Sequence, residues 1–110
     1  MTRTAILFAA LFGSTSALAD EAADKAQSCQ YQADVVAAVQ QARLDRVKER
    51  EVQAHILAQD PAWPEKFNNT IPLIAPWVYE QKRRIIRTED LSAVWTELCL
   101  QLPADAAAGQ

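Results

Sequence analysis

The 110-residue sequence is poor in the residues that most catalytic sites require, with two glycines, two cysteines and one histidine. Two glycines leave no glycine-rich phosphate loop, dinucleotide-binding pattern or nucleophile elbow. Two cysteines and one histidine are too few for an ordinary four-ligand zinc site. His55 has no nucleophile or marked carboxylate partner near it in the sequence, so we expect an ordinary helix histidine. The sequence therefore predicts no catalytic residue, no metal and no cofactor, and it argues against an enzyme.

A long hydrophobic run is also missing. The apolar residues 5–12 are too few to cross roughly 30 Å of hydrocarbon. Arg3 precedes this run and the small residues Ala17 and Ala19 follow it, which is the pattern of a signal peptide with its cleavage site. We therefore expect residues 1–19 to be a signal peptide that is cleaved after Ala19. The mature protein is then periplasmic or secreted, and no later stretch of it predicts a transmembrane segment.

The sequence has no excess of basic residues, because 11 Lys and Arg stand against 14 Asp and Glu, for a net charge of −3. Cleavage after Ala19 removes only one charged residue, Arg3, so the mature chain is more acidic still. A general nucleic-acid binder normally needs a basic surface. The charge balance therefore argues against nucleic acid as a partner.

Helix-forming residues dominate what is present, and little alternation typical of strands is seen. Residues 25–59 contain neither proline nor glycine, which predicts one long first helix with a bend, or two helices that abut near Arg50. The polar residues 20–26 before it are expected to fray. Residues 72–87 predict a second long helix, in which Pro76 either causes a bend or loosens one backbone hydrogen bond. Its basic residues fall near the predicted C-terminal end, where cations favour the helix dipole.

The last predicted helix covers residues 89–101, and Thr88 is its expected N-cap. Its apolar residues recur every three or four positions and predict one buried face, formed by Leu91, Val94, Trp95, Leu98 and Leu102. Together these patterns predict an all-α fold with three or four helices. We expect a single helical domain over residues 20–103, followed by a disordered tail over residues 104–110.

Two cysteines in an exported chain predict one structural disulfide, between Cys29 and Cys99. This bond would join the first helix to the last. Closing so long a loop should stabilise the fold by roughly 4 kcal/mol in the chain-entropy model.

Two groups of residues are candidates for binding a partner. Arg43, Arg46 and Arg50 follow helical spacing and would form a row on one face of the first helix. Such a row could grip an anionic ligand or an acidic partner, since guanidinium groups match carboxylates and phosphates. Alternatively, their stems cover the edge of the core while their heads pair with Glu80, Glu97 or solvent.

Trp63 and Trp77 form the second group, because both lie beside prolines in a segment expected to be irregular. An exposed pair of tryptophans would anchor a protein interface. The alternative is that both belong to the core, as most aromatic residues of small helical domains do.

The functional prediction follows from the predicted export, the missing catalytic motifs and these two groups. We expect a non-enzymatic module that binds another periplasmic or secreted protein. A periplasmic stress protein or chaperone-like protein is the alternative, and a small enzyme with a spatially assembled site is the third hypothesis.

Overall fold

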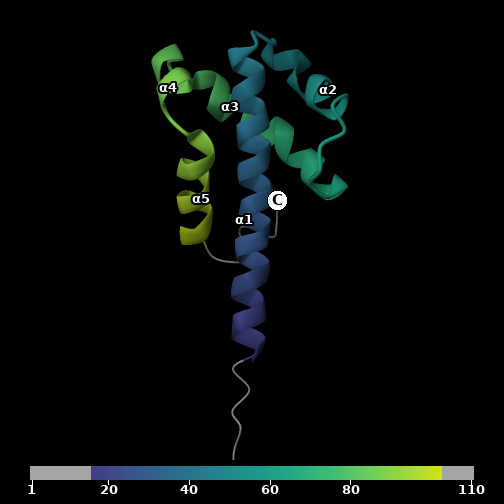
Figure 1. The fold of residues 1–110 in the computed structure, drawn as a ribbon, viewed down its shortest axis with the longest axis vertical. Helices are drawn as coiled ribbons and strands as arrows, with labels where there is room; N and C mark the ends of the chain where they lie inside the picture. The colour runs from purple at the N-terminus through teal and green to yellow at the C-terminus, as the bar shows by residue number, and fades with distance from the viewer. Residues whose placement is uncertain (1–15, 103–110) are drawn as a thin grey trace, which may run out of the picture.

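The computed structural model describes residues 16–102, and all regular secondary structure in this part of the chain is helical (Figure 1). The α-helices are α1 (Ser16–Leu44), α2 (Val52–Leu57), α3 (Ile71–Glu80), α4 (Arg83–Thr88) and α5 (Leu91–Gln101), and the 3-10 helices are η1 (Glu49–Glu51) and η2 (Glu65–Thr70). The predicted all-α fold with a long first helix is confirmed. The predicted tail and signal peptide, apart from residues 16–19, lie outside the described residues.

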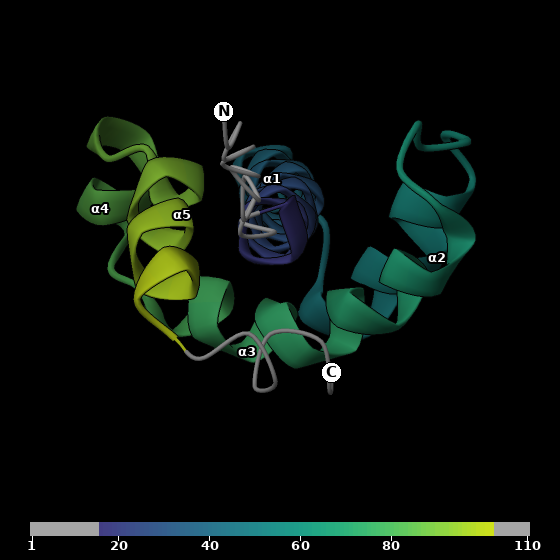
Figure 2. The same ribbon diagram turned by 90° about the horizontal axis from the view of Figure 1, so that it is seen from below.

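Helix α1 is the axis around which the other elements are arranged. Seen from below in Figure 2, α3 lies across one side of α1, with α4 and α5 on its second side and α2 on its third. Its middle part is therefore covered on several sides, and Val35, Val36 and Val39 are fully buried. The start of α1 extends beyond the other helices (Figure 1). The prediction that residues 20–26 fray was wrong, because they belong to this helix.

The predicted continuation of the first helix to residue 59 was also wrong, because α1 ends at Leu44. Arg46 has φ of 63°, which lies in the left-handed region. The Val47 N–H donates to the Ala42 carbonyl, and the Arg46 N–H donates to the Arg43 carbonyl. These two hydrogen bonds are those of a Schellman motif, which terminates a helix with a residue in the left-handed conformation.

Helix α3 contains Pro76 but is not interrupted there. Pro72 and Pro76 are both exposed, and Pro76 has no N–H to donate to the carbonyl of Pro72 four residues earlier. The single helix predicted over residues 72–87 is instead divided at Gln81 and Lys82, which are both extended, with ψ of 148°. This division directs α4 back toward α1, where Ile86 is buried.

Helix α5 begins two residues later than predicted, because its N-cap is Asp90 and not Thr88. The Asp90 carboxylate accepts hydrogen bonds from the N–H groups of Ser92 and Ala93. These bonds and the one from the Ser92 hydroxyl, which is the largest cause, hold the pKa of Asp90 below its ordinary value.

The buried side of α5 differs from the predicted apolar face. Leu91 and Cys99 are buried and Trp95 is half-buried, whereas Val94, Leu98 and Leu102 are exposed. The spacing of the buried set is four residues, so it is a narrow stripe. A narrow stripe suffices because α5 packs mainly against one helix, α1, beside which it lies (Figure 1).

The predicted disulfide is confirmed, since Cys29 of α1 is bonded to Cys99 of α5. Near it, the Lys25 ammonium group donates to the carbonyl of Leu100 at 2.7 Å and also to that of Leu102. These contacts satisfy carbonyl groups at the C-terminal end of α5, which have no partner within the helix. Both bonds hold the end of α5 against the early part of α1.

At the other end of α5, Gln40 forms a joint between α1, α4 and α5. Its amide nitrogen donates to the carbonyls of Ile86 and Glu89, each at 2.8 Å, and its amide oxygen accepts from the Leu91 N–H at 3.3 Å. One buried side chain of α1 thereby binds both the end of α4 and the start of α5. The position of α4 relative to α1 depends on this joint.

Candidate functional site

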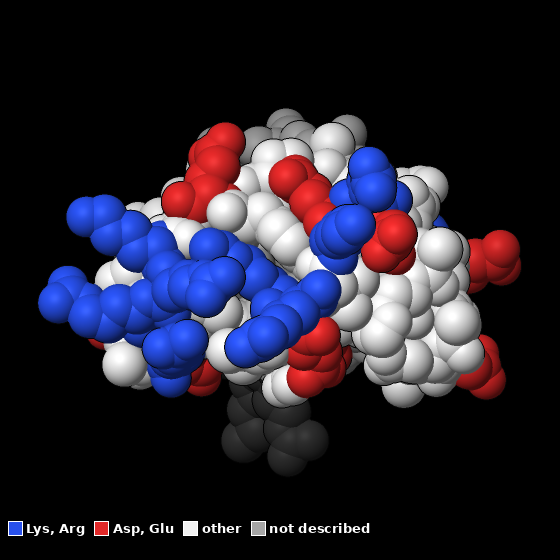
Figure 3. All heavy atoms as spheres, turned by 90° about the horizontal axis from the view of Figure 1, so that it is seen from above, with Lys and Arg blue, Asp and Glu red and all other residues white. Residues whose placement is uncertain are grey.

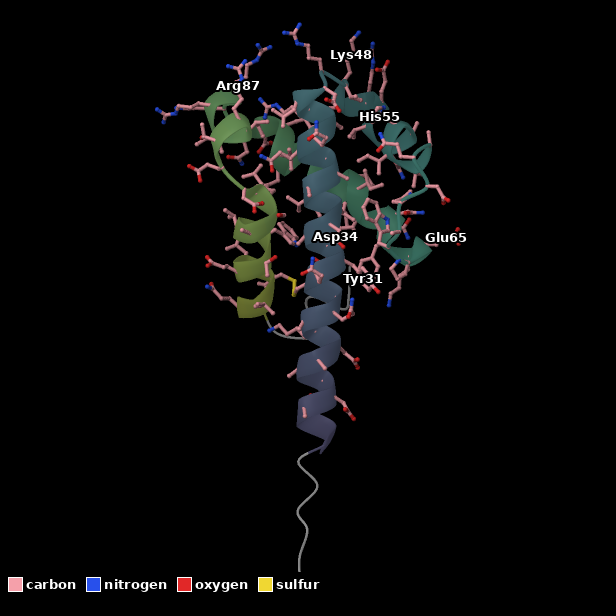
Figure 4. The ribbon with its side chains drawn as sticks, in the orientation of Figure 1. Tyr31, Asp34, Lys48, His55, Glu65 and Arg87 are labelled. Atoms are coloured by element: carbon pink, nitrogen blue, oxygen red, sulfur yellow. A yellow bond between two sulfur atoms is a disulfide. The ribbon has the colours of Figure 1, made fainter. Side chains whose placement is uncertain are left out.

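A cleft of about 410 Å³ lies between the C-terminal end of α1, the turn that follows it, and α4. Among residues 16–102, no Asp or Glu lines it, and the cationic side chains that do are Arg43, Arg46, Lys48, Arg83 and Arg87. We call this feature the cationic cleft. Figure 4 shows Lys48 and Arg87 at the same end of the molecule, and Figure 3 shows Lys and Arg gathered over that end.

Arg43 is held in the cleft by neutral groups. Its Nη1 donates to the carbonyl of Val78 at 2.6 Å, and its guanidinium carbon lies 5.8 Å from the centre of the Tyr79 ring. These partners differ from Glu80 and Glu97, the carboxylates considered in the sequence analysis. Because a carbonyl and a ring leave the charge of the guanidinium in place, Arg43 still contributes a full positive charge to the cleft.

Tyr79 in turn fixes the turn after α1. Its hydroxyl donates to the carbonyl of Val47 at 2.6 Å. Burial raises the pKa of the Tyr79 phenol, the charge of Glu49 adds to the rise, and the charge of Arg43 opposes it. Tyr79 is therefore a protonated donor at neutral pH, and it couples α3 to the cleft wall that carries Arg46 and Lys48.

Two positions at the cleft carry a local energetic cost. Arg46 adopts the left-handed conformation in which glycine is usual, at a cost of about 1 kcal/mol for a residue with a Cβ atom. Arg83 and Arg84 lie in the first turn of α4, next to the positive end of the helix dipole. The prediction that these cations lie near the C-terminal end of a helix was wrong for both, although Arg87 does occupy the last turn of α4.

The predicted arginine row is thus rearranged. Its three members do not share a helix face, because the helix ends before Arg46. Arg43 and Arg46 still meet in the cationic cleft, whereas Arg50 lies on η1 and lines a neighbouring hollow with Lys48 and Glu49. Sequence reasoning missed Lys48, Arg83 and Arg87 as members of the site. Helical spacing places Lys48 away from the arginine row. The only signal for the other two was the run of cations over residues 82–87.

The two predicted interface tryptophans do not form an exposed pair. Trp63 is half-buried, and its indole N–H donates to the Asn68 side chain at 2.8 Å. Trp77 is also half-buried, on α3, where its ring centre lies 5.5 Å from that of Trp95. Both tryptophans pack against the main core. Neither lines the cationic cleft.

The chemistry of the cleft is that of its cations. The described residues that line it include no serine, cysteine, histidine or carboxylate, the side chains that commonly act as nucleophile or base. His55 lies apart from it on α2, where its Nε2 is 2.9 Å from the amide nitrogen of Gln59. Within residues 16–102, no group of three or more His, Cys, Asp or Glu residues could hold a metal ion.

Two further findings bear on the class of protein. None of the helices within the described part of the chain is both long and apolar enough to cross a membrane. Comparison of the chain with protein-family models, curated proteins and solved structures gives no match.

Proposed function

We propose that this protein is an exported, non-enzymatic binding module whose cationic cleft captures an acidic segment of another periplasmic or secreted protein. The observation that carries the proposal is the cleft itself, whose described lining has five cations and no carboxylate, on a chain that is acidic overall. Arginine side chains form charge-assisted and bidentate hydrogen bonds to carboxylates. Four of the five cations are arginines.

The local costs at the cleft support a binding role. Arg46 at a left-handed position and Arg83 at a helix N-terminus both lower stability relative to residues that suit those positions better. Neither cost is offset by an ion pair within the cleft lining, which has no acidic side chain. Unfavourable local choices that cluster at one site are typical of function rather than of stability.

A protein partner fits the charge distribution better than a nucleic acid does. The chain has a net charge of −3, so a long polyanion would be repelled by most of its surface. A short acidic segment needs only the cationic end of the molecule, where Figure 3 shows one large group of Lys and Arg and a smaller group beside acidic residues.

Binding of a fluorescent hexaglutamate peptide, followed by anisotropy, tests the proposal. Arg46→Gly should weaken binding about tenfold, because a charge-assisted hydrogen bond contributes about 1.5–3 kcal/mol. The same substitution should not lower the melting temperature, since glycine suits the left-handed conformation. Asp60→Gly is the matched control, because Asp60 also has a positive φ, of 51°, and does not line the cleft.

A second pair of variants separates local contact from net charge. Arg83→Gln should weaken peptide binding more than Arg84→Gln, because Arg83 lines the cleft and Arg84, its neighbour on α4, does not. Equal effects of the two substitutions, or wild-type affinity in Arg46→Gly, would overturn the proposal. Export is tested by the intact mass of the exported protein, which should begin at Asp20 and change on reduction as expected for one disulfide.

A further inference from the structure

The lining of the cationic cleft includes apolar side chains as well as cations. Leu44, Val47 and Ile86 complete its lining. Ile86 is buried by the core, but Leu44 is 43% exposed at the end of α1, among the cations. An exposed leucine alone would need no explanation. Here it forms a wall of a concave site, where its apolar surface is available to whatever enters.

The cations stand on both walls of the cleft. Arg43, Arg46 and Lys48 come from the end of α1 and the turn after it, whereas Arg83 and Arg87 come from α4. Apolar side chains are likewise supplied by both walls, Leu44 by α1 and Ile86 by α4. A volume of about 410 Å³ lies within the range of sites that enclose a ligand group rather than a single ion.

From this arrangement we infer that the partner segment presents an apolar side chain flanked on both sides by carboxylates. The apolar side chain would cover Leu44 in the cleft, while the carboxylates would bind the arginines of the two walls. This inference rests on the proposed function and adds a sequence requirement to it. A free phosphate, or a purely acidic segment, would neutralise the positive charges of the cleft but leave Leu44 in contact with water.

The test compares two labelled pentapeptides with blocked ends and equal charge. Each has two glutamates on either side of a central residue, which is leucine in one peptide and serine in the other. The wild-type protein should bind the leucine peptide about tenfold more tightly, since burial of a leucine side chain is worth at least one decade of affinity. Leu44→Ser should reduce this preference severalfold and leave the affinity for the serine peptide unchanged.

Leu57→Ser is the matched control. Leu57 is the last residue of α2, as Leu44 is of α1, it is 39% exposed, and it does not line the cleft. This variant should retain the full preference for the leucine peptide. Because Leu44 and Leu57 are comparably exposed, the two substitutions should also change the melting temperature by similar amounts.

Each other result has a defined meaning. Equal affinity of the wild-type protein for the two peptides would overturn this inference while leaving the proposed capture of acidic segments in place. Binding of neither peptide would overturn both. The protein could instead bind phosphatidylglycerol vesicles in competition with the leucine peptide, and lose this binding in Arg46→Gly. That result would identify a lipid surface as the ligand in place of the acidic segment, and would also overturn the inference.

Discussion

Replacing Gln40 by methionine should be among the most damaging single substitutions at a polar residue of this protein. Methionine has nearly the same length, so the change removes hydrogen bonds and leaves most of the packing. Gln40 is 9% exposed, and two of its three hydrogen bonds, to the Ile86 carbonyl and from the Leu91 N–H, are buried. Both backbone groups would lose their partner without gaining access to bulk water.

The magnitude follows from the cost of unsatisfied groups. A buried donor or acceptor without a partner costs about 1–3 kcal/mol, so two such groups should lower the free energy of unfolding by about 2–6 kcal/mol. Urea denaturation of the oxidised protein measures this as a lower midpoint at unchanged m-value. Gln41→Met is the matched control. Gln41 is exposed, and its side-chain amide donates to the nearby Asp45 carboxylate at 3.1 Å.

Gln40 also connects stability to the proposed site. Since its amide nitrogen holds the Ile86 carbonyl at the end of α4, its loss should displace the helix that carries Arg83 and Arg87. Affinity for an acidic peptide should therefore fall in Gln40→Met even under conditions where the variant is folded. A free energy of unfolding within about 0.5 kcal/mol of the wild-type value would refute the joint between α1, α4 and α5.

Three further outcomes are expected. Replacing both Cys29 and Cys99 by serine should lower the free energy of unfolding by roughly 4 kcal/mol, and a reductant should then have no further effect on the urea midpoint. Trp95→Ala should cost about 3 kcal/mol, more than Trp63→Ala, because Trp95 packs on Trp77 and bonds Gln32 in the centre of the α1–α5 contact; equal urea midpoints would contradict this. Because burial raises the pKa of Tyr79, the folded state favours the protonated phenol. The contribution of this preference to the free energy of unfolding is complete below about pH 10 and is lost as pH rises through the raised pKa. Stability of Tyr79→Phe should accordingly fall less between pH 9 and pH 12 than that of the wild type.

The features that could be predicted from the sequence are those set by local pattern and by composition. The absence of proline and glycine over residues 25–59 correctly indicated helix in the first part of this range, and Val36 and Val39 proved to be core residues. Only one pairing is available to two cysteines in the same chain, so Cys29 and Cys99 were identified without knowledge of the fold. Each of these inferences needed only neighbouring residues or a count.

The features that could not be predicted depend on tertiary contacts. The end of α1 carries no glycine signal, because the left-handed position is occupied by Arg46. Pro76 is a strong local sign of a helix break, but its exposed position in α3 lets the helix continue. The cationic cleft joins residues 43–48 to residues 83–87. No repeating pattern in the sequence links these two segments. Gln40 brings them together by hydrogen bonds to backbone carbonyls, which every residue has and which therefore leave no signal in the sequence.

The failures of local rules are not distributed evenly over the chain, and their positions support the proposed site. A helix that ends in arginine instead of glycine, and a helix that starts with cations instead of acids, both occur at the walls of the cleft. The other left-handed residue is Asp60, and aspartate tolerates this conformation better than arginine does. Selection for stability alone would favour glycine at position 46 and acidic residues at the start of α4. Binding of an acidic segment, as proposed, would account for cations at these positions.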